Sequence, residues 1–274
     1  MPKEESLCVI IPVHKPDLTA DEILSLKACK KQLENYDCYL VFPESMDISA
    51  YLAVFDKLIA KPVDKKWLSS VEYYNQMKLG IWFYRMFEKY KFMLTYELDA
   101  YIFHADFNKV NVFSFDFIGA PFFQGYLQAT SNSPFIKGCN SGFSVRNIEK
   151  CIHILDSLEK YRGHWNFYKK FFYKIPKITF HLNRLTKGRF DIFINGMLGF
   201  YFEGSHMNED QVWSQIVPRL YKTFKVADPK SASRFSFEHN PEVLFETNQN
   251  ELPLGCHAWS KYSNFWKKYI IDYE

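Results

Sequence analysis

The sequence lacks the short motifs that mark several common enzyme classes. It contains no GxGxxG, the phosphate-binding turn of dinucleotide-binding domains, no GxxxxGKS or GxxxxGKT of P-loop kinases, and no GxSxG of hydrolases. The six cysteines are scattered and have no CxxC spacing, which argues against disulfides and against a zinc site. They indicate reduced thiols in a cytoplasmic protein.

Long apolar runs and a strong charge of one sign are also missing. No run reaches the length that spans a bilayer, and the first residues, MPKEESLCVI, are not those of a signal peptide. A net charge of +3 is too small to indicate a nucleic-acid binder. The basic residues lie in short aromatic-rich clusters, DKKW, YKKFFYK and WKKY. They are either exposed surface or a peripheral contact with the anionic inner face of a membrane.

The length of 274 residues, 47% of them hydrophobic, indicates one large α/β domain. The apolar run Leu7 to Val13 predicts a strand buried on both faces, and Thr19 with Glu22 predicts a capping box at the start of the next helix. With the following CYLVFP strand this is a βαβ unit, which implies a parallel sheet. There are no internal repeats.

Further elements follow from the spacing of apolar residues. We expect one long helix over 69–90, then the strand KFMLTYELDAYIF, a short strand FDFIGAPFF, a helix beginning at SVRNIEK and another beginning at NEDQVW. The pattern weakens over about 163–205, which we interpret as an aromatic-rich insertion covering one side of the sheet. Aromatic residues make up 19% of the chain, and such residues fill cores or stack on sugar rings; Phe122, Phe123, Trp213 and Trp259 are candidates for stacking.

Two carboxylates interrupt the apolar strand TYELDAYIF. If Glu97 and Asp99 both lie in the strand, they point to the same side, because side chains alternate with a period of two. An unpaired buried pair would be unfavourable, and a hard divalent cation such as Mg²⁺ or Mn²⁺ would relieve it while binding phosphate oxygens. Ligands of open α/β sheets bind at the carboxyl ends of strands. Alternatively, one acid pairs with a Lys or Arg and the other is exposed.

Other polar segments could complete a site. GCNSGFSVRN, from Gly138, has the small residues of a turn that backbone can use to approach a ligand, or it is a plain strand-to-helix connection. In NEDQVW, Asn208 at the N-cap with Gln211 at N3 would start a helix, and Asp210 or Glu209 could also serve as a general base.

Two histidines remain open between a structural and a chemical role. His257, in PLGCHAW, is either a core residue or a third metal ligand. His14 and Lys15, in PVHKP after the first strand, form a plain turn or face a nucleotide and its phosphates.

Seven motifs occur in order from about Cys8 to Trp259: CVIIPVHKP, YELDAYIF, FDFIGAPFF, GCNSGFSVRN, NEDQVWS, FSFEHNPE and PLGCHAW. In this order the chain resembles nucleotide-diphospho-sugar transferases of the GT-A type, and in particular the glycosyltransferase-like family labelled domain of unknown function 5672. The resemblance implies one GT-A-like domain over 1–274, with a mixed, mainly parallel sheet flanked by helices. Its nucleotide-sugar-binding half would cover about 7–135 and its acceptor side about 136–260.

The resemblance also implies roles for individual residues. Asp99 matches the final acid of the DxD-type motif, Glu97 stands where its first acid would be, and His257 matches a C-terminal metal ligand. Asp210 matches the base of inverting members, with Glu209 as the alternative. We expect the donor and its metal to contact Pro12, Val13, His14, Lys15, Asn75, Lys78, Glu97, Asp99, Ser141 and Gly142.

The implied activity is Mn²⁺- or Mg²⁺-dependent transfer of a sugar, with inversion, from a nucleotide-diphospho-sugar to a hydroxyl of a glycan or glycolipid. A UDP-sugar is the favoured donor, and surface polysaccharide biosynthesis the favoured context. A non-catalytic nucleotide- or carbohydrate-binding module on the same scaffold is the alternative. A nucleotidyltransferase, which would release pyrophosphate, is a third reading.

Overall fold

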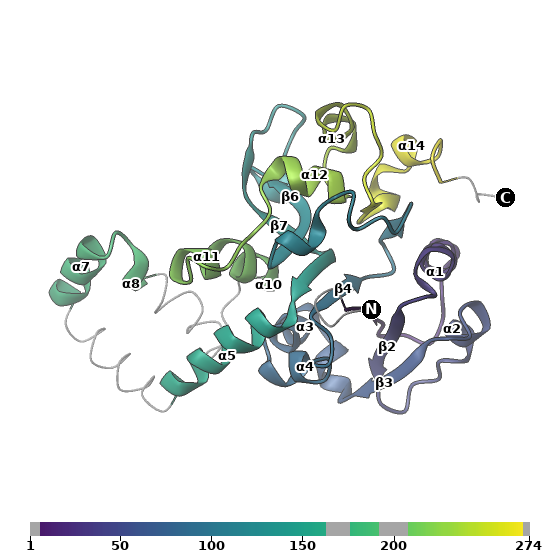
Figure 1. Cartoon of the computed structure of the whole chain (residues 1–274), viewed down its shortest axis with the longest axis horizontal. Helices are drawn as coiled ribbons and strands as arrows, with labels where there is room; N and C mark the ends of the chain where they lie inside the picture. Colours follow the sequence, from purple (N-terminus) through teal and green to yellow (C-terminus); the bar gives the residue numbers. More distant parts are fainter. Residues whose placement is uncertain (1–5, 163–175, 192–207, 271–274) are drawn as a thin grey trace.

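The computed structural model of the chain describes residues 6–162, 176–191 and 208–270. A six-stranded sheet with the order β3-β2-β1-β4-β7-β6 forms its centre (Figure 1). The pairs β1–β2, β1–β4 and β2–β3 are parallel, whereas β7 runs antiparallel to both β4 and β6. The expected mixed, mainly parallel sheet is therefore confirmed. Its strands are β1 Leu7–Pro12, β2 Asp37–Pro43, β3 Ile59–Val63, β4 Phe92–Tyr96, β6 Phe117–Phe123 and β7 Phe135–Asn147.

The first βαβ unit forms as the sequence predicts. Between β1 and β2 lies α1, Ala20–Leu33, which begins at the expected capping box. The Thr19 hydroxyl accepts a hydrogen bond from the Glu22 backbone N–H at 3.3 Å, and the Glu22 carboxylate accepts one from the Thr19 N–H at 2.7 Å. These bonds satisfy two N–H groups that a helix start leaves without partners. The apolar run of β1 is buried on both faces.

The prediction of a single long helix over 69–90 is wrong. Two shorter helices occupy the region, α3 Val71–Lys78 and α4 Ile81–Arg85, and Gly80 between them is extended, with φ −81° and ψ 128°. An added Cβ at Gly80 would lie 2.6 Å from the Trp82 Nε1 atom. The side chain of Trp82 therefore folds back over the break, and only glycine leaves room for it.

The prediction of a turn around Gly138 is also wrong. Residues 135–147 form one strand, β7, which pairs with β4 along Tyr96–Phe143 to Phe92–Asn147 and with β6 on its other side. The following helix, α5 Ile148–Arg162, starts four residues later than SVRNIEK suggests. Gly138 has a φ of 129° and the β6–β7 register shifts nearby. The small residues thus serve an irregular strand instead of a loop.

The remaining helices pack around the sheet or extend from it. Helices α1 and α2 contact each other, α4 contacts α5, and α12 packs on β6 and β7. The NEDQVW helix is confirmed as α10, which continues through a π-helical turn at Val212–Ile216 into α11. Bounds not yet given are α2 Ser49–Val54, α7 Pro176–Leu185, α8 Arg189–Asp191, α10 Glu209–Gln211, α11 Val217–Leu220, α12 Pro229–Phe235, α13 Pro241–Thr247 and α14 Ser263–Trp266.

The expected insertion is described only in part. Residues 163–175 and 192–205 of that range lie outside the described part of the chain. Its described portion forms α7 and α8, which lie at one end of the molecule, well away from the strands (Figure 1). For 176–191, the expectation that the insertion covers a side of the sheet is therefore wrong.

A second, small sheet joins distant parts of the chain. It has the order β5-β9-β8, and each strand has two residues: β5 Tyr101–Ile102, β8 Ser236–Phe237 and β9 Gly255–Cys256. β9 runs antiparallel to β5 and parallel to β8. Its register brings the start of β5 and the ends of β8 and β9 to one edge. Within the described ranges, no helix combines the length and apolarity needed to cross a bilayer.

Candidate active site

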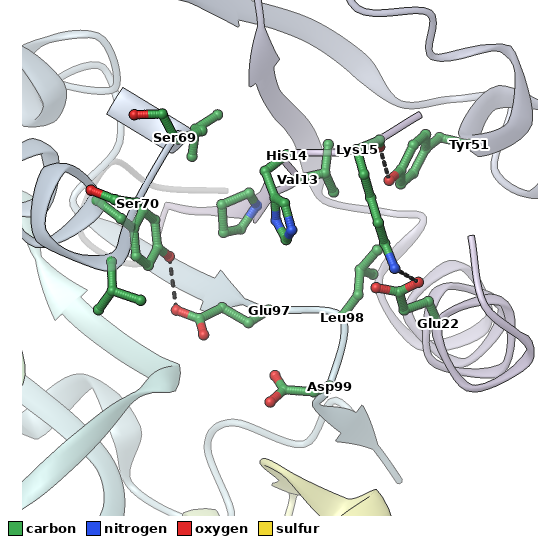
Figure 2. Close-up of a pocket in the computed structure, with 14 residues that line it drawn as sticks. Val13, His14, Lys15, Glu22, Tyr51, Ser69, Ser70, Glu97, Leu98 and Asp99 are labelled. Carbon is green, nitrogen blue, oxygen red and sulfur yellow. Dashed lines mark hydrogen bonds and ion pairs between the residues drawn. The ribbon is translucent and has the colours of Figure 1, made fainter. Parts of the chain in front are cut away.

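A cleft of about 420 Å³ opens at the carboxyl ends of β1 and β4. Of the predicted donor-contacting residues, Pro12, Val13, His14, Lys15, Glu97 and Asp99 line it. Figure 2 shows Glu97, Leu98 and Asp99 along one wall, His14 facing them, and Ser69 and Ser70, which precede α3, on the side nearer Glu97. The other four residues expected to contact the donor do not line it: Asn75, Lys78, Ser141 and Gly142.

Lys15 is held in place at the other end of the cleft. Its Nζ lies 2.9 Å from Oε2 of Glu22, and its backbone carbonyl accepts a hydrogen bond from the Tyr51 hydroxyl at 2.7 Å (Figure 2). Burial raises the pKa of Tyr51 to about 12, so this hydroxyl keeps its proton at neutral pH. Glu22, the N3 residue of the capping box of α1, therefore also orients the Lys15 ammonium group toward the cleft.

The two acids come together, but not through strand geometry. β4 ends at Tyr96, and Glu97 to Ala100 form a turn in which the Ala100 N–H donates to the Glu97 carbonyl at 2.8 Å. The Glu97 N–H donates to the Gly142 carbonyl on β7 at 2.9 Å. The alternation argument for Glu97 and Asp99 is thus wrong in its reason, because the turn, and not a strand, directs both side chains into the cleft.

Glu97, Asp99 and His257 form a group of potential metal ligands. One ligand atom from each lies within 4.8 Å of the others. The Nε2 atom of His257 is 3.0 Å from Oδ1 of Asp99 and 3.6 Å from Oε2 of Glu97. Neighbouring ligands in an octahedral shell of about 2.1 Å radius lie about 3 Å apart, so the group fits a Mg²⁺- or Mn²⁺-sized ion with little rearrangement. Carboxylate oxygens and an imidazole nitrogen also suit Mn²⁺ chemically.

The small sheet assembles this group. Asp99 lies two residues before β5 and His257 directly follows β9, so their antiparallel pairing brings them together. The Trp259 N–H donates to the Asp99 carbonyl at 3.3 Å. Burial works to lower the pKa of His257, but the Asp99, Glu238 and Glu97 carboxylates outweigh it and raise that pKa well above the ordinary value. The imidazole therefore lies in a strongly negative environment.

Lys78 does not line the cleft; it lies behind the wall as a buried cation. Its Nζ is 2.6 Å from Oε1 of Glu209, 3.3 Å from Oε1 of Glu97 and 3.0 Å from the Ser141 hydroxyl. Burial works to raise the pKa of Glu97, yet Lys78 and His257 hold it well below the usual range. Glu97 therefore stays ionised, with the Tyr74 hydroxyl donating a further hydrogen bond at 2.8 Å.

Glu209 is a buried ion-pair partner. Its Oε1 contacts both Lys78 and, at 2.9 Å, Nη2 of Arg146 on β7, and its side chain is 1% exposed. Burial opposes ionisation, but the two cations lower the pKa of Glu209. A carboxylate so enclosed is a poor proton acceptor for a substrate, which disfavours the base role for Glu209.

Asp210 is buried, does not line the cleft, and differs from Glu209 in its electrostatics. Burial, followed by the charge of Glu209, raises its pKa to about 7, so the carboxylate is poised to exchange a proton at neutral pH. The expected side-chain cap by Asn208 is not formed. Instead, Asn75 donates to Asn208 at 3.2 Å and accepts from the Glu209 N–H at 3.2 Å. Asn75, expected to contact the donor, fixes the start of this helix.

Gly142 and Ser141 also support the site from behind. An added Cβ at Gly142 would lie 2.0 Å from Nε2 of His257, so the imidazole packs directly on this backbone. Ser141 is buried and accepts from Lys78. The close backbone approach predicted for GCNSGFSVRN is real, but it receives a side chain of the protein.

The four aromatic residues proposed to stack on sugars are core residues. Trp213 and Trp259 are fully buried, and Phe122 and Phe123 are 7% and 2% exposed. Trp213 stacks on Phe224 with its ring nitrogen donating to the Lys78 carbonyl. That prediction was wrong, because apolar aromatics in a core and in a sugar site look alike in sequence.

Sequence reasoning missed Arg146, Tyr74 and Glu238. Arg146 and Tyr74 contact the acids of the site, and Glu238 lies 3.3 Å from Nδ1 of His257. Two of them lie inside motifs that were recognised, Arg146 in GCNSGFSVRN and Glu238 in FSFEHNPE. In each of these two motifs, a charged residue among apolar or small residues was the sequence feature that could have indicated a role in the site.

Comparisons with known proteins agree with this architecture. The family described as Protein of unknown function (DUF5672) matches residues 57–257, and no curated protein matches the chain. Mouse xyloside xylosyltransferase 1, in its apo form, is similar with a TM-score of 0.51 at 10% identity, over 92% of this chain and 97% of that one. This likeness shows the fold, and the GT-A-like fold expected from the sequence is confirmed.

Two further solved structures are similar at lower scores. The galactosyltransferase LgtC, in complex with donor and acceptor sugar analogs, has a TM-score of 0.47 at 11% identity, over 91% of this chain and 86% of that one. Core-mannan synthase A (CmsA/Ktr4) from Aspergillus fumigatus, in an Mn/GDP form, has a TM-score of 0.46 at 11% identity, over 77% of this chain and 69% of that one.

Proposed function

The chain belongs to the DUF5672 family and has a glycosyltransferase fold of the GT-A type, and from these premises we propose that it transfers a sugar from a nucleotide-diphospho-sugar to an acceptor hydroxyl. The observation that carries the proposal is the convergence of Glu97, Asp99 and His257, of which the two acids line a cleft that also holds His14 and Lys15. Three ligands for a divalent cation beside two basic side chains suit the diphosphate of an activated sugar.

In this proposal, Asp99, His257 and Glu97 hold a Mn²⁺ or Mg²⁺ ion. When bound, the ion supplies electrostatic stabilisation for the negative charge that develops on the departing nucleoside diphosphate. His14 and Lys15 face the nucleotide from the end of β1. Lys78, behind Glu97, keeps that carboxylate ionised and therefore able to serve as a ligand.

Asp210 is the proposed general base. Its carboxylate takes the proton of the acceptor hydroxyl as the oxygen forms a bond to the anomeric carbon and the bond from that carbon to the diphosphate oxygen breaks. A single displacement of this kind inverts the anomeric configuration. The raised pKa of Asp210 supports the assignment, as does the ion-paired state of the alternative, Glu209. A positioned base contributes about 10²–10⁴-fold to the rate.

Family resemblance is the basis for the acceptor and the setting. We propose a glycan or glycolipid hydroxyl as acceptor, surface polysaccharide biosynthesis as the context, a UDP-sugar as the first donor to test, and a cytoplasmic location. Peripheral membrane contact stays a prediction. Of the basic clusters behind it, Lys65–Lys66 and Lys267–Lys268 are exposed, and YKKFFYK lies outside the described residues.

The test is a panel of nucleotide sugars, UDP-sugars first, incubated with and without Mn²⁺. We expect release of nucleoside diphosphate that requires the ion, is abolished in Asp99→Ala and is retained in Asp56→Ala, which replaces an exposed acid that does not line the cleft. Tight nucleotide-sugar binding without release would instead favour a non-catalytic module. Release of pyrophosphate would point to a nucleotidyltransferase, and either result would contradict the proposal.

A further inference from the structure

A third carboxylate faces His257 from the side opposite Asp99. Oε1 of Glu238 lies 3.3 Å from the Nδ1 atom of His257, while Nε2 of the same ring lies 3.0 Å from Asp99. The Glu238 side chain is 7% exposed. The imidazole is therefore held between carboxylates at both of its nitrogens, and one of these acids is deeply buried.

The small sheet fixes this arrangement. Glu238 directly follows β8, His257 directly follows β9, and these strands are parallel with Phe237 opposite Cys256. The His257 N–H donates to the Phe237 carbonyl at 2.8 Å, so the two backbones are joined at this point. The backbones that carry the two side chains therefore cannot separate without breaking the end of the sheet.

The Glu238 carboxylate is itself anchored. The Asn140 side-chain amide on β7 donates to Oε1 at 3.2 Å, and Nε2 of the neighbouring His239 lies 3.7 Å away. Asn140 also accepts from the Gly142 N–H at 2.8 Å, and the His257 ring packs on Gly142. The acid, the ring and the glycine beneath the ring form one connected unit.

Among the described residues, the ligand group comprises Glu97, Asp99 and His257 but not Glu238. Glu238 contacts the nitrogen that points away from that group. Nδ1 makes no hydrogen bond at this distance, so Glu238 acts through its charge, which favours a proton on Nδ1 and leaves the Nε2 lone pair for an ion. Loss of such a partner typically weakens metal binding about 10- to 100-fold.

We propose that Glu238 is a positioning residue that orients His257 toward the metal through Nδ1. The inference rests on the proposed function, because it assigns a task to a residue behind the proposed metal site. It also gives a reason for the buried acid in FSFEHNPE, which the donor cleft does not use.

A double-mutant cycle on Mn²⁺ affinity tests this role without any measurement of transfer. The probe is Mn²⁺ alone, and free Mn²⁺ is followed by electron paramagnetic resonance in the wild type, Glu238→Gln, His257→Ala and the double variant. We expect Glu238→Gln to weaken binding about 10- to 100-fold in the wild type and to have almost no further effect once His257 is absent. The matched control is Glu242→Gln, which removes an exposed acid from α13 nearby.

Equal effects of Glu238→Gln with and without His257 would overturn the proposal, since Glu238 would then act on the ion by itself or by its charge alone. An equal loss in Glu242→Gln would overturn it for the same reason. If Glu238→Gln does not fold, Glu238→Asp replaces it in the cycle, with the charge kept and the reach shortened by one methylene. A wild type that binds no Mn²⁺ would overturn the metal site and this inference together. A wild type that binds Mn²⁺, with the same affinity in Glu238→Gln, would overturn this inference only.

Discussion

The ring of His257 lies directly against the backbone of Gly142. An added Cβ at Gly142 would be 2.0 Å from Nε2 and 2.5 Å from each of the two neighbouring ring carbons. The same glycine accepts a hydrogen bond from the Glu97 N–H through its carbonyl. One residue without a side chain thus sets the position of two of the three potential metal ligands.

Replacing Gly142 by Ala should therefore disrupt the site. The methyl group must displace the imidazole, so we expect Mn²⁺ affinity to fall at least about tenfold, with a loss of stability of about 1–3 kcal/mol from overpacking. Mn²⁺ binding and urea unfolding measure the two effects. Gly188→Ala is the control: its φ of 81° strains an added side chain, but nothing lies within 4 Å. It should lose some stability and keep Mn²⁺ affinity. Unchanged affinity in Gly142→Ala would contradict the packing argument.

The raised pKa of Asp210, about 7, predicts the pH dependence of transfer. The base must be ionised to accept a proton, so kcat should fall about tenfold per pH unit below pH 7 and level off above it. Asp210→Asn should retain nucleotide-sugar binding and lose about 10²–10⁴-fold in kcat, with the acidic limb removed from the residual rate. The measurement is a pH–rate profile of both proteins. A wild-type rate in Asp210→Asn would refute the base assignment.

The same residue should affect stability in a pH-dependent way. The native pKa lies near 7 and the ordinary value is 3.8, so between these pH values the native state holds a proton that the unfolded chain has lost. Stability from this group is therefore present below pH 3.8 and is lost as pH rises through 7. Asp210→Asn should unfold at a higher temperature than the wild type at pH 8, by roughly 4 °C or more, and at the same temperature near pH 4. A destabilised variant at pH 8 would contradict the raised pKa.

Glu209 should prove essential for stability. Replacing it by Gln leaves Lys78 and Arg146 as buried cations without their shared carboxylate, and loss of one partner from a buried ion pair costs about 3–5 kcal/mol. The comparison is Asp56→Asn, which breaks the exposed Lys30 pair and should leave stability almost unchanged, because solvent screens such pairs. Urea unfolding of both variants gives the two free energies. Similar small losses would show that Glu209 is not needed to neutralise the cations.

The sequence sufficed where local chemistry decides the structure. The capping box of Thr19 and Glu22 and the apolar run of β1 depend on neighbouring residues, and both formed as expected. Asp99 and His257 were identified by residue type and motif order, and they meet at 3.0 Å.

Long-range packing explains what the sequence did not reveal. No sequence pattern near Gly80 indicates that the Trp82 side chain will occupy the space that a longer helix needs. Glu238 reaches His257 through strands of two residues each, and such strands leave no periodic pattern. Lys78, expected to contact the donor, is buried against Glu209, which lies far along the chain. These contacts exist only after the fold has brought the segments together.

The size of the small sheet has a consequence for the folded chain as a whole. With two residues in each strand, few backbone hydrogen bonds tie the C-terminal segment to β5. An ion shared by Asp99 and His257 would act as a cross-link that closes a loop of more than half the chain, much as a disulfide does in an oxidising compartment. Divalent cations should then slow amide hydrogen exchange at Cys256 and Phe237, because a bound ion makes the C-terminal segment more rigid.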